Sequence, residues 1–169
     1  MKRFATIVLA ASLLCSVGTA LAQEEHKHDH SSAAKGPKLE KAYLQQVLDA
    51  WCTLEPKNAA KFYGKGTDHV FYDVSPLQYR GWAEYEKGAG EFLKTLKSAK
   101  MVLKDDTQIH QEGGIAWSTS TMDFTMVGQD GKTVAMPLRW TAIWHNHGAN
   151  WVIAHEHVSA PLPEEPPKQ

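Results

Sequence analysis

Apolar side chains in the first half of the chain recur with helical spacing in two stretches, with a shorter helical segment between them. The first stretch predicts an amphipathic helix over about residues 39–54. A short helix is expected over 56–63, with Gly64 as a terminator. A third helix is expected to begin near Trp82. The apolar faces of the two longer helices comprise Leu39, Tyr43, Val47, Trp51 and Leu54, and then Tyr85, Ala89, Phe92, Leu93 and Leu96.

The second half of the chain has the pattern of strands joined by tight turns. Two short strands are expected first, at 70–74 and 79–81. Four long strands are then expected at roughly 99–111, 115–127, 133–145 and 150–159. Glycines between them, at Gly113-Gly114, Gly131 and Gly148, supply the positive backbone angles that hairpin turns require. The long strands therefore predict an antiparallel meander.

This order of elements predicts an α+β fold. Helices and strands are segregated along the chain, so the helices are expected to cover one face of a curved sheet. A curved sheet and its helices enclose a pocket of the kind that binds small molecules.

Residues 1–22 have the pattern of a removable signal peptide. A basic start at Lys2 and Arg3 precedes an apolar run over 4–17 and an Ala-Leu-Ala cleavage pattern. The run is shorter than the roughly 18 apolar residues of a membrane span, and no later stretch approaches that length. We therefore expect a periplasmic or secreted protein with no membrane contact after cleavage.

A polar arm separates this signal from the domain. It has no apolar period that could pack, so we expect disorder. His26, His28 and His30 on the arm can gather copper, zinc or nickel, or the tract is simply a solvated linker. The expected divisions of the chain are a signal at 1–22, the arm at 23–37, one domain at 38–161 and a proline-rich tail at 162–169.

Composition argues against a nucleic-acid-binding protein and limits the size and the covalent cross-links of the domain. Eighteen Lys and Arg stand against 19 Asp and Glu, a balance that becomes more acidic without the signal, so no nucleic-acid partner is expected. Cleavage after residue 22 leaves 147 residues, which suits one domain. Cys52 would then be the only thiol, and no intramolecular disulfide is expected.

Short motifs between residues 39 and 161 carry a resemblance to a known family. They are Phe62-Tyr63, Val70-Phe71-Tyr72-Asp73, Tyr79-Arg80-Gly81-Trp82, the run from Trp140 to Trp144 and the run from Trp151 to Pro161. On these motifs the chain resembles the SnoaL-like branch of the nuclear transport factor 2-like superfamily. The resemblance implies a cone-shaped barrel in which a curved, mostly antiparallel sheet packs against three helices.

The same resemblance spans enzymes and non-enzymes. The superfamily contains isomerases, cyclases, dehydratases, binding modules and oligomerisation hubs, so fold alone does not assign a function. The ending from Trp151 to Pro161 is also similar to that of the calcium/calmodulin-dependent protein kinase II association domain, an assembly module. It resembles the His-His-His-Ser-Ser ending of iota-class carbonic anhydrases too, with Glu156 and Val158 in place of the middle histidine and the first serine.

Asp73 is the first candidate for acid-base chemistry. It lies at the end of the first strand, where the resembling ketosteroid isomerases place a proton-carrying aspartate. A carboxyl group in an apolar cavity has a raised pKa and can move protons near neutral pH. Tyr63, Tyr72 and Trp82 would supply the walls and a hydroxyl of a ligand site. Alternatively, Asp73 caps the turn that follows it.

The last strand carries a second group of candidates. His155 and His157 alternate with other residues and, on a regular strand, would face the same side as Trp151 and Ile153. They are interpreted as acid-base groups, as two zinc ligands in need of a third, or as a polar cluster at a pocket or a dimer interface.

Three further residues on the central strands are candidates for ligand contacts. Arg139 can clamp a carboxylate with two hydrogen bonds, or it pairs with Asp123 or Glu156 across the sheet. Trp117 and Trp140 would form pocket walls, or they belong to the core or to an interface.

The sequence thus predicts an exported domain that binds a small, partly apolar molecule in its cone pocket, as a homodimer through the outer sheet face. One alternative is a cofactor-independent acid-base enzyme, an isomerase, dehydratase or hydratase, that uses Asp73 with His155 or His157. The other is a non-catalytic oligomerisation module. No cofactor is expected, because export delivers the domain to a compartment poor in nucleotide cofactors.

Overall fold

The computed structural model describes residues 37–162 of the chain. The predictions for the signal peptide, for the arm with His26, His28 and His30, and for nearly all of the tail lie outside the described residues. In the described part, no helix is both long and apolar enough to span a membrane.

Three α-helices are present in this part of the chain. They are α1 (Lys41–Cys52), α2 (Pro56–Ala59), which a 3-10 turn (Ala60–Phe62) continues, and α3 (Gly81–Leu93). The helical spacing of apolar residues puts Val47 and Trp51 on the buried face of α1, and Tyr85 and Ala89 on that of α3. The centres of the two predicted apolar faces are therefore confirmed. Phe92 differs, because 46% of its surface is exposed, and the predicted members Leu39, Leu54 and Leu96 lie outside the helices.

The strands of the described residues form one seven-stranded sheet. They are β1 (Val70–Tyr72), β2 (Tyr79–Arg80), β3 (Leu96–Leu103), β4 (Gln108–Glu112), β5 (Ile115–Gly128), β6 (Thr133–His147) and β7 (Asn150–Ser159). The order across the sheet is β2-β1-β7-β6-β5-β3, and β4 also pairs with β5. All neighbours are antiparallel except β1 and β7, which are parallel.

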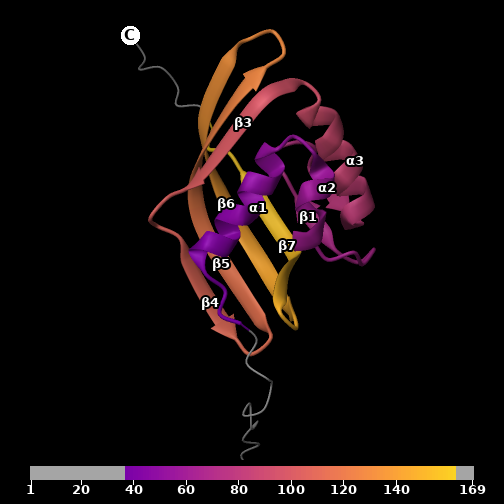
Figure 1. Cartoon of the computed structure of the whole chain (residues 1–169), viewed down its shortest axis with the longest axis vertical. Coiled ribbons are helices and arrows are strands. Elements are labelled where there is room, and N and C mark those ends of the chain that lie inside the picture. The colour runs from indigo at the N-terminus through magenta and orange to yellow at the C-terminus, as the bar shows by residue number, and fades with distance from the viewer. Residues whose placement is uncertain (1–36, 163–169) are drawn as a thin grey trace, which may run out of the picture. The chain divides into compact units, whose positions relative to one another are not determined.

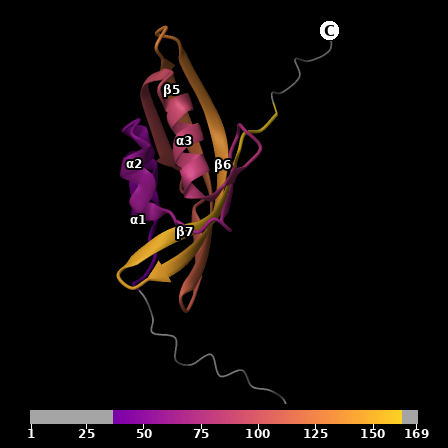
Figure 2. The same cartoon turned by 90° about the vertical axis from the view of Figure 1, so that its right-hand side faces the viewer.

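The helices cover one face of this curved sheet (Figure 1). Seen from the helical side, α3 lies in front of β5 and β6, and α1 lies beside it (Figure 2). The predicted α+β architecture, with three helices packed against a curved and mostly antiparallel sheet, is confirmed. The sheet does not close into a full barrel, because its order runs from β2 at one edge to β3 at the other.

Two predicted boundaries are wrong. The expected strand 99–111 is two strands, because the chain turns at residues 104–107, where the Asp106 carboxylate accepts hydrogen bonds from the backbone and hydroxyl of Thr121. The third helix ends at Leu93 rather than Leu96, and Leu96 instead opens β3 with 5% of its surface exposed. An apolar residue three positions beyond a helix end fits either structure by spacing alone.

The core fills the space between the helices and the inner face of the sheet. Trp140, Trp144 and Trp151 are its largest fully buried side chains. Each indole nitrogen has a partner; Trp144 donates to the Ser118 hydroxyl at 2.9 Å and Trp151 to the Pro37 carbonyl at 2.8 Å. Buried indole N–H groups thus meet the requirement for a hydrogen bond.

A bulge in β7 decides which side chains face this core. Ile143 pairs with His155, yet the next residue of β6, Trp144, pairs with Ile153, so Ala154 is one extra residue on β7. An extra residue reverses the inward and outward alternation beyond it. Ile153 is buried before the bulge and Glu156 is buried after it, with 1% of its surface exposed. The prediction that His155 and His157 share a face with Trp151 and Ile153 is therefore wrong.

Candidate functional site

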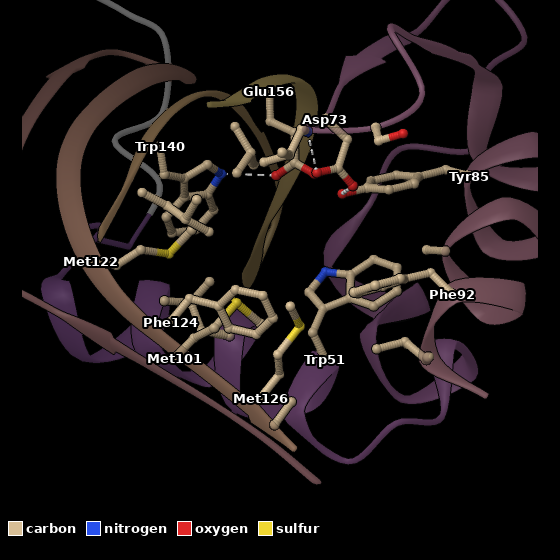
Figure 3. Close-up of a pocket in the computed structure, with 18 of the residues that line it drawn as sticks. Trp51, Asp73, Tyr85, Phe92, Met101, Met122, Phe124, Met126, Trp140 and Glu156 are labelled. Atoms are coloured by element: carbon tan, nitrogen blue, oxygen red, sulfur yellow. Dashed lines mark hydrogen bonds between the residues drawn. The ribbon is translucent and has the colours of Figure 1, made fainter. Parts of the chain in front are cut away.

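A cavity of about 260 Å³ lies between the helices and the inner face of the sheet (Figure 3). Most of its wall is apolar. The side chains of this apolar wall that bear on the argument are Leu48, Phe92, Leu93, Met101, Met122, Phe124, Met126, Met136 and Leu138. Four of the five methionines of the chain line it, and these unbranched, polarizable side chains adapt to ligands of varied shape.

The polar groups of the cavity gather at one end of it, where Asp73 lies near Glu156 and Tyr85 (Figure 3). Asp73 follows β1, Glu156 comes from β7 and Tyr85 from α3. Because β1 and β7 are adjacent parallel strands, with Tyr72 opposite His157, their inward side chains meet at this end of the sheet. Sheet topology therefore joins two carboxyl groups that are 83 positions apart in the chain.

Glu156 is held by hydrogen bonds from aromatic side chains. Trp140 Nε1 donates to Glu156 Oε2 at 2.8 Å, and the Tyr63 hydroxyl lies 3.0 and 3.1 Å from the two carboxylate oxygens. Trp51 Nε1 in turn donates to the Tyr63 hydroxyl at 2.8 Å. A continuous chain of hydrogen bonds thus runs from α1 to the carboxyl group on β7, and such chains polarise one another.

Burial raises the pKa of Glu156 to about 7. The low-polarity surroundings disfavour the charged carboxylate, and the nearby Asp73 charge adds to this effect. Hydrogen bonds from Tyr85, Trp140 and Tyr63 oppose it by favouring the anion. Glu156 is consequently poised to gain or lose a proton near neutral pH.

Asp73 is less enclosed by protein than Glu156 is. Its Oδ1 accepts a hydrogen bond from the backbone of Val74 at 2.7 Å, and the Tyr85 hydroxyl lies 3.5 Å from its Oδ2. Burial is the main cause that raises its pKa, and these two hydrogen bonds oppose the shift. Asp73 therefore lines the cavity and also makes the local turn contact expected of a capping aspartate.

Three of the predicted site residues line the cavity, and one lies behind its wall. Tyr63, Asp73 and Trp140 contact the open space directly. Trp82 is buried behind them, with its ring centroid 4.8 Å from that of Tyr63. Trp82 thus supports the position of Tyr63 without lining the cavity.

The other predicted residues lie on the outer face of the sheet. Tyr72 packs edge-on against His155 and His157, with ring centroids 5.3 and 5.8 Å apart, and His155 Nδ1 lies 2.6 Å from the Val70 carbonyl oxygen. The expectation that these three residues would line the pocket with Asp73 is wrong. Tyr72 alternates with the inward Phe71, and the bulge turns both histidines outward.

Trp117 and Arg139 also face outward from the central strands. Trp117 stacks on His110 with ring centroids 5.2 Å apart, and Arg139 borders a shallow hollow with Thr119 and Thr121. Neither residue lines the cavity, because β5 and β6 direct alternate side chains to the inner face. The expected pairing of Arg139 with Asp123 or Glu156 is wrong too, since Asp123 pairs with Lys104 at 2.9 Å and Glu156 lies on the opposite face.

The predicted homodimer through the outer sheet face stays a prediction. That face exposes apolar and aromatic surface at Ile115, Trp117 and Ile143, between 37% and 50% of each residue.

In the described residues, no group of three or more His, Cys, Asp or Glu could hold a metal ion.

Sequence reasoning does not single out Glu156 and Tyr85 as site residues. In the sequence, Tyr85 is simply one more member of the apolar face predicted for the third helix. Glu156 is flanked by Ala154 and Val158 at alternate positions, which hints at an inward carboxyl group, but a regular strand starting from Ile153 would turn it outward.

Comparisons with known proteins agree with this geometry. The model of the SnoaL-like domain family matches residues 44–163. No curated protein matches the chain. Among solved structures, a nuclear transport factor 2-like superfamily protein from Salmonella enterica is 20% identical with a TM-score of 0.63, and the match covers 75% of this chain and 94% of that one.

Two other solved structures indicate the range of this fold. A candidate calcium/calmodulin-dependent protein kinase II association domain from Xanthomonas campestris is 20% identical, with a TM-score of 0.63 over 72% of this chain and 84% of that chain. A candidate scytalone dehydratase from Novosphingobium aromaticivorans is 8% identical, with a TM-score of 0.64 over 72% of this chain and 80% of that chain. At these identities the likeness concerns the fold alone.

Proposed function

This chain belongs to the SnoaL-like domain family, and from that premise we propose that it binds a small, partly apolar molecule in the cavity between its helices and its sheet. The family lies in the nuclear transport factor 2-like superfamily, which includes isomerases and dehydratases. The proposal includes export of the domain, in keeping with the signal pattern of residues 1–22.

The observation that carries the proposal is the division of one cavity into two chemical ends. Methionine and phenylalanine side chains form one end, and Asp73, Tyr85 and Glu156 form the other. An apolar cavity with a few convergent polar groups is the usual form of a small-molecule site. The volume of about 260 Å³ lies just under the usual range of about 300–1,000 Å³, which favours a ligand of modest size.

Filling the apolar end should abolish binding. Ala99 lines the cavity from β3, so in Ala99→Phe the larger side chain occupies the space that the ligand would fill. Native mass spectrometry of protein purified from its host should detect a bound small molecule in the wild type and not in this variant. Val102→Phe is the matched control, because Val102 lies on the same strand but is 42% exposed and faces away. Equal ligand retention in both variants would contradict the proposal.

Acid-base catalysis is the second candidate, and the two carboxyl groups at one end of the cavity favour it. A general acid or base works best with a pKa near the working pH. Burial raises the pKa of Asp73 and brings that of Glu156 to about 7. Asp73 with Glu156 therefore replaces the pair of Asp73 with a histidine that the sequence suggested.

Proton transfer at carbon can be tested without knowledge of the substrate. The protein with its co-purified ligand is incubated in D₂O, and an acid-base enzyme should exchange ligand C–H for C–D. Asp73→Asn should remove the exchange and leave the melting temperature nearly unchanged, since asparagine still accepts the hydrogen bond of Val74. Asp49→Asn, on the exposed face of α1, should exchange as the wild type does. Absence of exchange in the wild type would rule out this candidate.

A further inference from the structure

The cavity contains two acidic side chains and no basic one. Within the described residues, the groups that line it include Asp73 and Glu156 but no lysine, arginine or histidine. The salt bridges of the same part of the chain involve neither of these two carboxyl groups. Any negative charge at this end of the cavity is therefore without a protein countercharge.

An ionised carboxyl group at this end of the cavity is energetically costly for the protein without a ligand. Charged groups removed from water are normally paired with an opposite charge, and hydrogen bonds alone compensate only in part. Glu156 is 1% exposed and receives hydrogen bonds from Trp140 and Tyr63, yet both donors are neutral. A positively charged group of a ligand would supply what the protein lacks.

Aromatic rings form part of the cavity wall beside these carboxyl groups. Trp51, Tyr63 and Tyr85 line the cavity and pack against one another, with ring centroids 5.2 to 5.8 Å apart. The negative face of an aromatic ring attracts a cation within about 6 Å, and cages of such rings recognise ammonium groups. The aromatic rings and the carboxylates of the cavity therefore both favour a ligand with a positively charged group.

We propose that the cavity takes an amine: a molecule whose ammonium head lies between Asp73 and Glu156 and whose apolar body extends along the methionines. This inference rests on the proposed function, because it names the ligand class of that cavity. An amine is already protonated in neutral solution, as a lysine side chain is. It therefore brings its charge with it and favours the ionised form of both carboxyl groups.

The head charge is tested with three probes that share one body: 4-phenylbutylamine, 4-phenylbutanol and 4-phenylbutanoate. Binding is measured by titration calorimetry at pH 7. The amine should bind about tenfold or more tightly than the alcohol, because charge-assisted hydrogen bonds are about twice as strong as neutral ones, and the carboxylate should bind worst.

Two variants locate the effect. Glu156→Gln should bring the affinity for the amine close to that for the alcohol, and Asp73→Asn should do so in part even if Glu156→Gln does not fold. Glu112→Gln, an exposed position on β4, should keep the full preference for the amine.

The possible results separate this inference from the proposed function. Alcohol binding as tight as amine binding, or tightest binding by the carboxylate, overturns the amine ligand but leaves small-molecule binding in place. Binding by none of the three probes overturns the amine ligand as well, and the proposed function then depends on the co-purified molecule alone.

Discussion

Glu156→Gln should remove a large part of the pH dependence of folding stability between about pH 4.5 and 7. Burial raises the pKa of Glu156 from 4.5 to about 7 in the folded protein. The folded state therefore holds a proton that the unfolded chain releases at lower pH. The stability linked to this proton is fully present below pH 4.5 and is lost as the pH rises through 7.

The size of this effect follows from the shift. A difference of one pKa unit corresponds to about 1.4 kcal/mol, so the free energy of unfolding of the wild type should fall by about 3 kcal/mol relative to the variant over this interval. Urea denaturation of both proteins at several pH values measures the difference. Glu112→Gln, with its exposed side chain, should follow the wild type, and parallel curves for wild type and Glu156→Gln would show that Glu156 is not the titrating group.

Trp140→Ala should be the most destabilising of the substitutions considered at the cavity. The indole is 1% exposed and donates the 2.8 Å hydrogen bond to Glu156. Removal of a buried tryptophan costs about 3–5 kcal/mol through lost packing and the space left behind. The loss of a donor to a buried carboxyl group adds to this cost and should raise the pKa of Glu156 further.

Trp117→Ala is the matched control, because it removes the same side chain from the opposite face of the same sheet. Trp117 is 37% exposed, so its removal should cost about 1 kcal/mol. Urea denaturation of both variants at one pH compares the two faces. A loss in Trp117→Ala as large as that in Trp140→Ala would mean that the outer face is buried in solution, as the predicted homodimer requires.

The sequence predicts the local elements well because their signals are local. Spacing of apolar residues identifies α1 and α3, since one helical turn brings positions three and four apart onto one face. The glycines at the hairpin turns are equally clear signals in the sequence. Gly113, Gly131 and Gly148 all have positive φ angles, 59°, 81° and 72°, which residues with a side chain rarely adopt.

The candidate site is only partly predictable, for a reason that lies in β7. Asp73 can be found through the resemblance to ketosteroid isomerases, which place a proton-carrying aspartate at the end of this strand. His155 and His157 are misplaced, and Glu156 is missed, because the extra residue Ala154 reverses the alternation halfway along the strand. A bulge depends on how a strand pairs with its neighbour, and within β7 itself the only sign of it is that the apolar residues Ala154 and Val158 stand two positions on either side of Glu156.

The sequence alone therefore determined the α+β class, most of the helix faces and the meander, because each of these depends on residues close together in the chain. The resemblance to ketosteroid isomerases supplied the acidic candidate Asp73. Only the tertiary structure decided which face of the sheet each strand residue occupies beyond the bulge. It also brought Glu156 on β7 beside Asp73 after β1, enclosed both among Trp51, Tyr63 and Tyr85, and left them without a countercharge. Burial and neighbouring charges set the chemistry of a carboxyl group, and both arise from contacts between residues far apart in the sequence.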